Sequence, residues 1–139
     1  MVSQMNNKEM PKFNKEEMMA KTRELMKLGE NEERIGIMVC KKSTDRCSGV
    51  WCHWAFEQKA KSFEQYKDRN VKLFTFIHCS GCDTDRDNDP KFNHKLEELH
   101  NVYVNKIHFG VCIKNSCPNV EELCKQLEKR GIEWEIGTH

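Results

Sequence analysis

Hydrophobic positions along this 139-residue chain fall into short apolar runs separated by amphipathic segments. The run at 34–40 is nearly continuous, which is typical of a strand buried on both faces of a sheet. The runs at 71–78, 106–111 and 132–136 predict three further strands, and we expect 71–78 and 132–136 to end as buried strands.

Segments with helical spacing lie between the predicted strands. Residues 49–67 place aromatic side chains and alanines about one turn apart, which predicts one helix. Asp89 followed by Pro90 supplies a cap and a first-turn proline for a helix over 90–100. A third helix is expected over 118–130, because a glycine follows the last position of its pattern.

The N-terminal part carries one more helix signal. Asn14 and Glu17 have the spacing of a capping box, and good helix formers follow them up to Gly29. This pattern predicts an amphipathic helix over 14–28 that leans on the rest of the chain.

Strands that alternate with helices predict an α/β fold with a mainly parallel, four-stranded sheet. The connections are expected to be right-handed, in a single three-layer domain of flavodoxin-like or similar architecture. We expect this domain over 33–139, and an N-terminal arm with its extra helix over 1–32.

Length and charge narrow the classes of function. The chain is long enough to bury a core, and 23 Lys and Arg against 22 Asp and Glu give a net charge of +1. Such a balance gives no general reason to bind nucleic acid or an anionic membrane. No apolar run approaches the roughly 20 residues of a membrane span, and the N-terminus lacks the apolar core of a secretory signal. We therefore expect a cytoplasmic protein.

The eight cysteines change this picture, because clustered cysteines in a reducing compartment most often bind metal or carry out redox chemistry. In a parallel sheet the carboxyl ends of all strands lie at one edge, where open α/β sheets bind ligands. Most of the cysteines, and the C-terminal histidine, follow predicted strands and are expected to converge there as metal ligands: Cys40, Cys47, Cys52, Cys79, Cys82, Cys112, Cys117 and His139.

The ligand types point to a soft metal. Thiolates, with imidazole as a further donor, make tetrahedral zinc sites, and groups of four thiolates hold iron–sulfur clusters. The turn from Cys79 to Cys82 is tight enough for both sulfurs to face one ion. Helix N-termini beside Cys52, Cys82 and Cys117 are expected to lower the pKa of these thiols. Thiolate ligands alone do not distinguish a site for zinc from one for copper(I) or iron.

Two alternatives stay open beside a metal-binding role. The first is a redox protein, either an iron–sulfur electron carrier or a dithiol oxidoreductase, although a thioredoxin-type C-x-x-C opens a helix and 83–90 has the composition of a loop. The second is an interaction module in which zinc only stabilises the fold. A hydrolase triad, a phosphate-binding glycine loop and a dinucleotide fingerprint are all missing from the sequence.

Several other residues that could bind a metal or lie near one are assigned roles other than metal ligation. Cys124 falls on the apolar face of its helix and is expected in the core. His53 and His78 neighbour cysteines, but neighbours along a strand point to opposite faces, so we expect neither to be a ligand. Trp51 could shield a metal site from water. The acidic loop 83–90 lacks the glycine and glutamate of a calcium loop.

These residues resemble the CGGC-domain family, small prokaryotic domains described as metal-binding. The resemblance runs over about 33–139 and includes IGIMVC, Cys47-x4-Cys52, SFEQY, CSGC, Cys-Pro and the terminal GTH. It implies that zinc or another thiophilic metal is bound by the cysteines and histidine named above. Ser80 stands where the family's CGGC motif has its first glycine.

Overall fold

A computed structural model describes residues 14–83 and 85–139 of the chain. The elements are, in order, α1 (Lys15–Leu25), β1 (Glu33–Val39), the 3-10 helix η1 (Lys42–Asp45), α2 (Val50–Glu57), the 3-10 helix η2 (Lys61–Tyr66), β2 (Val71–His78), α3 (Pro90–Asn101), β3 (Lys106–Phe109), α4 (Val111–Ser116), α5 (Val120–Glu128) and β4 (Glu133–Ile136).

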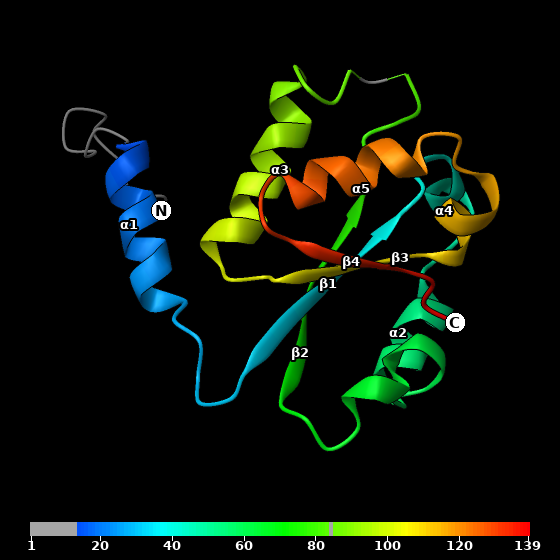
Figure 1. Ribbon diagram of the computed structural model, residues 1–139, viewed down its shortest axis with the longest axis horizontal. Coiled ribbons are helices and arrows are strands. Elements are labelled where there is room, and N and C mark those ends of the chain that lie inside the picture. Colours follow the sequence, from blue (N-terminus) through cyan, green and yellow to red (C-terminus); the bar gives the residue numbers. More distant parts are fainter. Residues whose placement is uncertain (1–13, 84) are drawn as a thin grey trace, which may run out of the picture.

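The four strands form one sheet in the order β2-β1-β3-β4, and every neighbouring pair is parallel. Helices α3 and α5 cover one face of this sheet, and α2 with η2 covers the other (Figure 1). The predicted three-layer α/β fold with a parallel four-stranded sheet is therefore confirmed.

Two hydrophobic cores lie on the two faces, and β1 contributes to both because successive side chains of a strand point in opposite directions. Ile35, Ile37 and Val39 pack with the aromatic residues of α2 and η2. Met38 packs on the other side with α3 and α5. Six of the seven residues of β1 are buried, as predicted for 34–40.

Gly36 lies in β1, at a point where side chains of the neighbouring strands β2 and β3 approach its backbone closely. It pairs with Ile107 on β3, and the register with β2 shifts just before it. A Cβ at this position would lie 2.5 Å from Thr75 Cγ2 and 2.8 Å from Ile107 Cδ1. A larger residue would therefore have to displace the Thr75 and Ile107 side chains.

The predicted helix over 49–67 is wrong in one respect, because it is broken into α2 and η2. Lys59 and Lys61 adopt positive φ values of 50° and 54°, and Ala60 between them is extended. The Ala60 N–H donates to the Ala55 carbonyl, a bond that closes the end of a helix. The break turns the chain so that Phe63 of η2 packs edge-on against Phe56 of α2.

Three predicted strands differ from the structure, one at its end and two in their burial. The third strand stops at Phe109, because Gly110 caps α4 and the chain coils from Val111 onward. The outer strands β2 and β4 are less buried than expected, since each has a neighbour on one side only. β2 is mostly half-buried and β4 mostly exposed, so the expected buried strand before His139 is wrong.

Helix α1 begins as predicted, with the Asn14 side chain accepting from the Glu17 N–H at 3.1 Å. It has no buried residue and lies beside α3 (Figure 1). Its contacts are polar: the Tyr103 hydroxyl donates to the Arg23 carbonyl, and the Arg23 guanidinium approaches Asn101 at 3.5 Å. The first residues of the predicted arm, 1–13, lie outside the described part of the chain.

Candidate functional site

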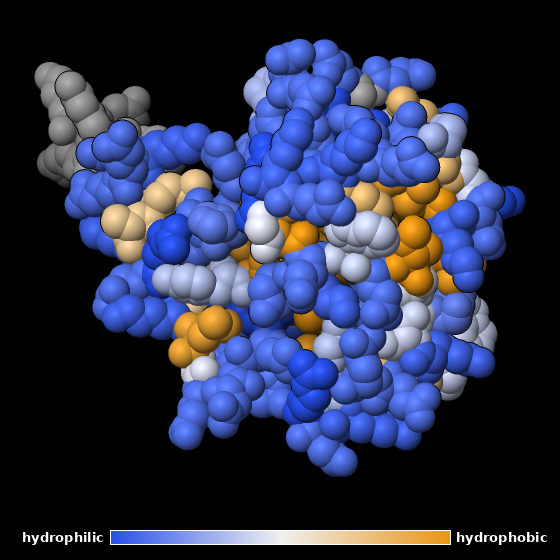
Figure 2. Space-filling view, in the orientation of Figure 1, coloured by the Kyte–Doolittle hydropathy of each residue, from blue (hydrophilic) through white to orange (hydrophobic). Residues whose placement is uncertain are grey.

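The strands are parallel, so their carboxyl ends lie at one edge of the sheet, toward the upper right of Figure 1, and several cysteines follow these ends in the sequence. Cys40 directly follows β1 and Cys79 directly follows β2. Cys112 is the second residue of α4, three positions after β3 ends. In Figure 2, hydrophobic surface gathers over α4, whereas most of that face is hydrophilic. All eight cysteines are free thiols.

One group of thiols, group A, consists of Cys79, Cys82 and Cys117. Burial raises the pKa of the Cys117 thiol, and the Cys79 and Cys82 thiols add to this rise. Cys79 is buried, whereas Cys82 and Cys117 are half-buried.

The turn that carries group A is held by polar contacts. The Asn119 side chain donates to the Cys82 carbonyl at 2.9 Å, and the Arg86 guanidinium donates to the Gly81 carbonyl at 2.6 Å. Ser80 and Gly81 both have positive φ, 70° and 109°. The position where the family has a glycine is therefore left-handed here, a conformation that costs a serine roughly 1–2 kcal/mol.

A second group, group B, consists of Cys47, Cys52 and Cys112. Burial raises the pKa of the Cys52 thiol, and Cys112 and Cys47 raise it further. The Cys52 sulfur lies 3.3 Å from the Thr138 hydroxyl, so the C-terminal segment packs directly against this group. Cys112 contacts both hydrophobic cores and lies between their layers.

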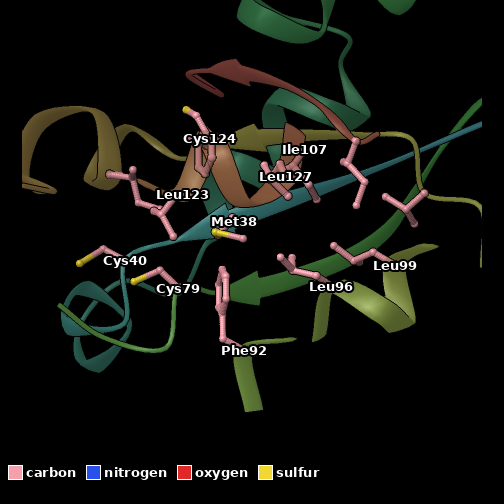
Figure 3. Close-up of a cluster of buried hydrophobic side chains, with 14 residues drawn as sticks. Met38, Cys40, Cys79, Phe92, Leu96, Leu99, Ile107, Leu123, Cys124 and Leu127 are labelled. Carbon is pink, nitrogen blue, oxygen red and sulfur yellow. The ribbon is translucent and has the colours of Figure 1, made fainter. Parts of the chain in front are cut away.

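Cys40 differs from the other thiols in its hydrogen bonds. Burial alone would raise its pKa, but the backbone N–H groups of Ser43 and Lys42 and the Ser43 hydroxyl bring the pKa of Cys40 below its usual value. Its own N–H donates to the Cys112 sulfur at 3.2 Å, which ties it to group B. Figure 3 shows Cys40 and Cys79 at the same end of one core cluster.

The structure does not bring all the predicted ligands into one crevice. Across residues 14–83 and 85–139, no set of three or more His, Cys, Asp or Glu side chains is already placed to hold a metal ion. His139 is exposed, although its neighbour Thr138 is fully buried. In donor type both groups fit a soft metal, since each offers three thiols.

The prediction that helix N-termini lower thiol pKa is wrong for Cys52 and Cys117. Burial dominates at both and raises their pKa. Cys117 also caps the end of α4 rather than opening a helix. Trp51, expected as a possible shield, is 62% exposed and so covers little.

The residues interpreted structurally lie as expected. Cys124 is buried in the core beside Leu123 and Leu127, and burial raises its pKa to about 11. The ring of His53 stacks on Phe76 at 4.9 Å between centroids. His78 instead takes part in a polar contact with Lys95, at 3.3 Å between Nδ1 and Nζ.

Sequence reasoning missed the residues that support the thiols. Thr138 beside Cys52 and the amides around Cys40 become visible only when distant segments meet. The one local signal was Ser43, three residues after Cys40, a spacing at which serine often bonds nearby backbone or side-chain groups.

In the part of the chain that the structure describes, no helix combines the length and the apolar character needed to cross a bilayer.

Comparisons with known proteins identify the family of the chain. The sequence model of the CGGC domain matches residues 34–139. The chain is 32% identical over 117 residues to the uncharacterized protein MJ0582 of Methanocaldococcus jannaschii, an alignment that covers 76% of this chain and 86% of the relative. No solved structure gives a significant match. The chain is therefore a cysteine-rich member of the CGGC-domain family.

Proposed function

We propose that this protein binds a thiophilic metal, as zinc or as an iron–sulfur cluster, through thiolates at the carboxyl edge of its sheet. The observation that carries the proposal is the position of Cys40, Cys79 and Cys112 just after the ends of three parallel strands, at one edge of the sheet. Such thiols have no structural need to lie near one another, since none forms a disulfide. A reducing, cytoplasmic compartment would keep them free.

The ligands proposed are those named from the sequence. Group A offers three thiols from the turn after β2 and the segment before α5, and group B offers three more beside the C-terminal segment. Cys40 and His139 are the further donors from which a fourth ligand would come. The full proposed set is Cys40, Cys47, Cys52, Cys79, Cys82, Cys112, Cys117 and His139.

The chain's own residues prepare these thiols for binding. Burial keeps the Cys52 and Cys117 thiols protonated at neutral pH, so binding must release their protons and its affinity should fall on acidification. The contacts of Asn119 and Arg86 hold the turn of group A in place before any ion arrives. A bound metal would supply a soft Lewis acid or an electron-accepting cluster.

A pair of cysteine variants tests the assignment. Cys82→Ala removes a thiol of group A, whereas Cys124→Ala removes a core thiol and serves as the matched control. We expect Cys82→Ala to lower the zinc content after anaerobic reconstitution, or to weaken zinc affinity at least tenfold, while Cys124→Ala binds like the parent. Equal zinc binding by all three proteins would overturn the assignment.

A redox function is the second candidate, and Cys40 is the observation that favours it. Hydrogen bonds lower the pKa of the Cys40 thiol, which favours its reactive form, and the Cys40 backbone N–H donates to the Cys112 sulfur, so a second cysteine lies close by. In that case the metal-free protein should contain one thiol pair that oxidises reversibly, and Cys40→Ala should abolish it. If Cys40→Ala weakens metal binding and the parent protein has no reversibly oxidised thiol pair, only the metal-binding proposal stands.

A further inference from the structure

An open pocket of about 600 Å³ lies at the same edge of the sheet, between the end of β2 and the start of α3. Three lysines line it: Lys41 from the segment after β1, and Lys91 and Lys95 from α3. His78, Asp85 and Asp89 also line the pocket. The thiol groups described above do not form this wall.

The lysines of this pocket form no direct ion pair in the described part of the chain. Within residues 14–83 and 85–139, none of Lys41, Lys91 and Lys95 comes within 4.0 Å of a carboxylate oxygen. Most other surface lysines can spread into solvent, but these three share one concave wall. Placing like charges together is unfavourable unless an anion joins them.

The two aspartates of the wall are already used by the backbone. Asp89 caps α3, accepting from the Lys91 N–H at 3.1 Å. Asp85 accepts from the Asp87 N–H at 3.2 Å and from the Asn88 amide at 2.9 Å. Both carboxylates keep their negative charge, and Asp89 also acts on the Lys95 ammonium, so three lysines face two aspartates and the wall keeps an excess of positive charge.

Lys95 is a fixed charge and not a mobile surface lysine. It is half-buried, and its ammonium donates to the Ser80 hydroxyl at 2.8 Å and to the His78 carbonyl at 3.1 Å. A charge held in place contributes to binding without the entropy cost of ordering a free side chain.

The hydrogen bonds of His78 define which of its nitrogens is a donor. Nδ1 accepts from the Ser80 N–H at 3.3 Å and faces the Lys95 ammonium at the same distance. The ring proton of the neutral imidazole is therefore on Nε2. In the described part of the chain Nε2 has no hydrogen-bond partner and is not buried, so its N–H can serve a ligand.

We propose that this pocket binds the phosphate or carboxylate group of a small molecule. Lys41 and Lys91 supply mobile cations, Lys95 a fixed one, and His78 an N–H donor, which together suit an oxyanion. His78 and Ser80 flank Cys79, so the bound anion would lie next to the proposed metal ligands. The binding itself needs no metal, and the inference does not rest on the proposed function.

Titration with inorganic phosphate and, separately, with malonate tests this inference. Binding is followed by the NMR chemical shifts of the backbone N–H groups of the reduced protein. The ionic strength is kept constant, and the titration is done with and without chelator. We expect saturable shifts at Ser80 and Lys91, and the tighter anion identifies the head group. Shifts that follow total salt without saturation, or that appear with a divalent cation and not with the anions, would overturn the proposal.

Charge-removing variants locate the binding. Lys41→Gln and Lys91→Gln are exposed positions and should each weaken phosphate binding about tenfold, the effect expected for one unit charge near a dianion in a partly solvated site. Lys114→Gln makes the same charge change on exposed α4, outside the pocket, and should bind like the parent. An equal loss in all three variants would mean general charge screening and no pocket.

Discussion

A buried hydrogen bond between Tyr66 and His108 gives the most quantitative prediction from this structure. The Tyr66 hydroxyl lies 2.7 Å from His108 Nε2, and the two side chains are 2% and 0% exposed. The other ring nitrogen, Nδ1, bonds to the Gly137 carbonyl at 3.4 Å. A carbonyl only accepts, so the ring proton is on Nδ1 and Tyr66 donates to Nε2.

Tyr66→Phe removes the donor and leaves the imidazole nitrogen buried and unsatisfied. Such a loss costs about 1–3 kcal/mol, and we expect about 2 kcal/mol here because neither side chain can reach water. For a chain of this length the midpoint of thermal unfolding should fall by about 6–10 °C.

The assay is urea unfolding of the parent and two variants, followed by circular dichroism. Tyr103→Phe is the matched control, since Tyr103 is only partly buried and its hydroxyl makes a 3.4 Å bond to the Arg23 carbonyl. We expect its stability to stay within about 0.5 kcal/mol of the parent. If Tyr66→Phe costs no more than Tyr103→Phe, the reasoning about the buried pair is refuted.

The hydrogen bond between Tyr66 and His108 is also linked to Cys52 of group B through the C-terminal segment. His108 holds the Gly137 carbonyl, and the next residue, Thr138, contacts the Cys52 sulfur. Tyr66→Phe should therefore speed alkylation of Cys52, measured by peptide mass spectrometry, relative to Tyr103→Phe. An unchanged alkylation rate at Cys52 would show that the hydrogen bond between Tyr66 and His108 does not affect the thiols of group B.

Three further predictions follow from the fold and its charges. Gly36→Ala should cost about 1–3 kcal/mol in urea unfolding because its Cβ would meet Thr75 and Ile107, whereas Gly29→Ala, which meets only the flexible Glu32 side chain, should cost less than half as much. Burial lowers the pKa of His108, so the unfolded state binds the extra proton and stability should fall as pH drops below about 6.5; a flat stability profile between pH 7.5 and 5.5 would contradict this. Chelator treatment should shift the thermal midpoint only slightly if the two cores suffice for folding, and a large fall would show that metal and fold are linked.

The layer arrangement was predictable because it depends on the sequence pattern of each segment alone. Apolar runs alternating with helical segments predict parallel strands, and parallel strands place Cys40 and Cys79 at one edge. The N-caps Asn14 and Asp89 were also recognisable, since each bonds an N–H within three residues of itself.

The details that depend on contacts between distant segments were not predictable. The exposure of Ile136 follows from the edge position of β4 in the sheet, which no local pattern encodes. The break at Lys59 depends on how η2 must turn to reach the core. Burial outweighs local helix ends at Cys52, so its pKa rises where a sequence argument predicts a fall.

The position of Cys112 was not predictable from the sequence alone. It packs against both hydrophobic cores, including the one that contains Cys40 and Cys79. Its sulfur also accepts from the Cys40 N–H, a contact between segments 72 residues apart that no local pattern encodes.

The most direct test of the central claim is metal analysis of the protein purified without oxygen or chelator, with a visible spectrum of the same sample. Our account predicts at least one equivalent of zinc with no visible absorption, or iron and sulfide with broad absorption that bleaches on reduction. A colourless protein with well under one equivalent of any metal per chain, with all eight thiols still reduced, would contradict it.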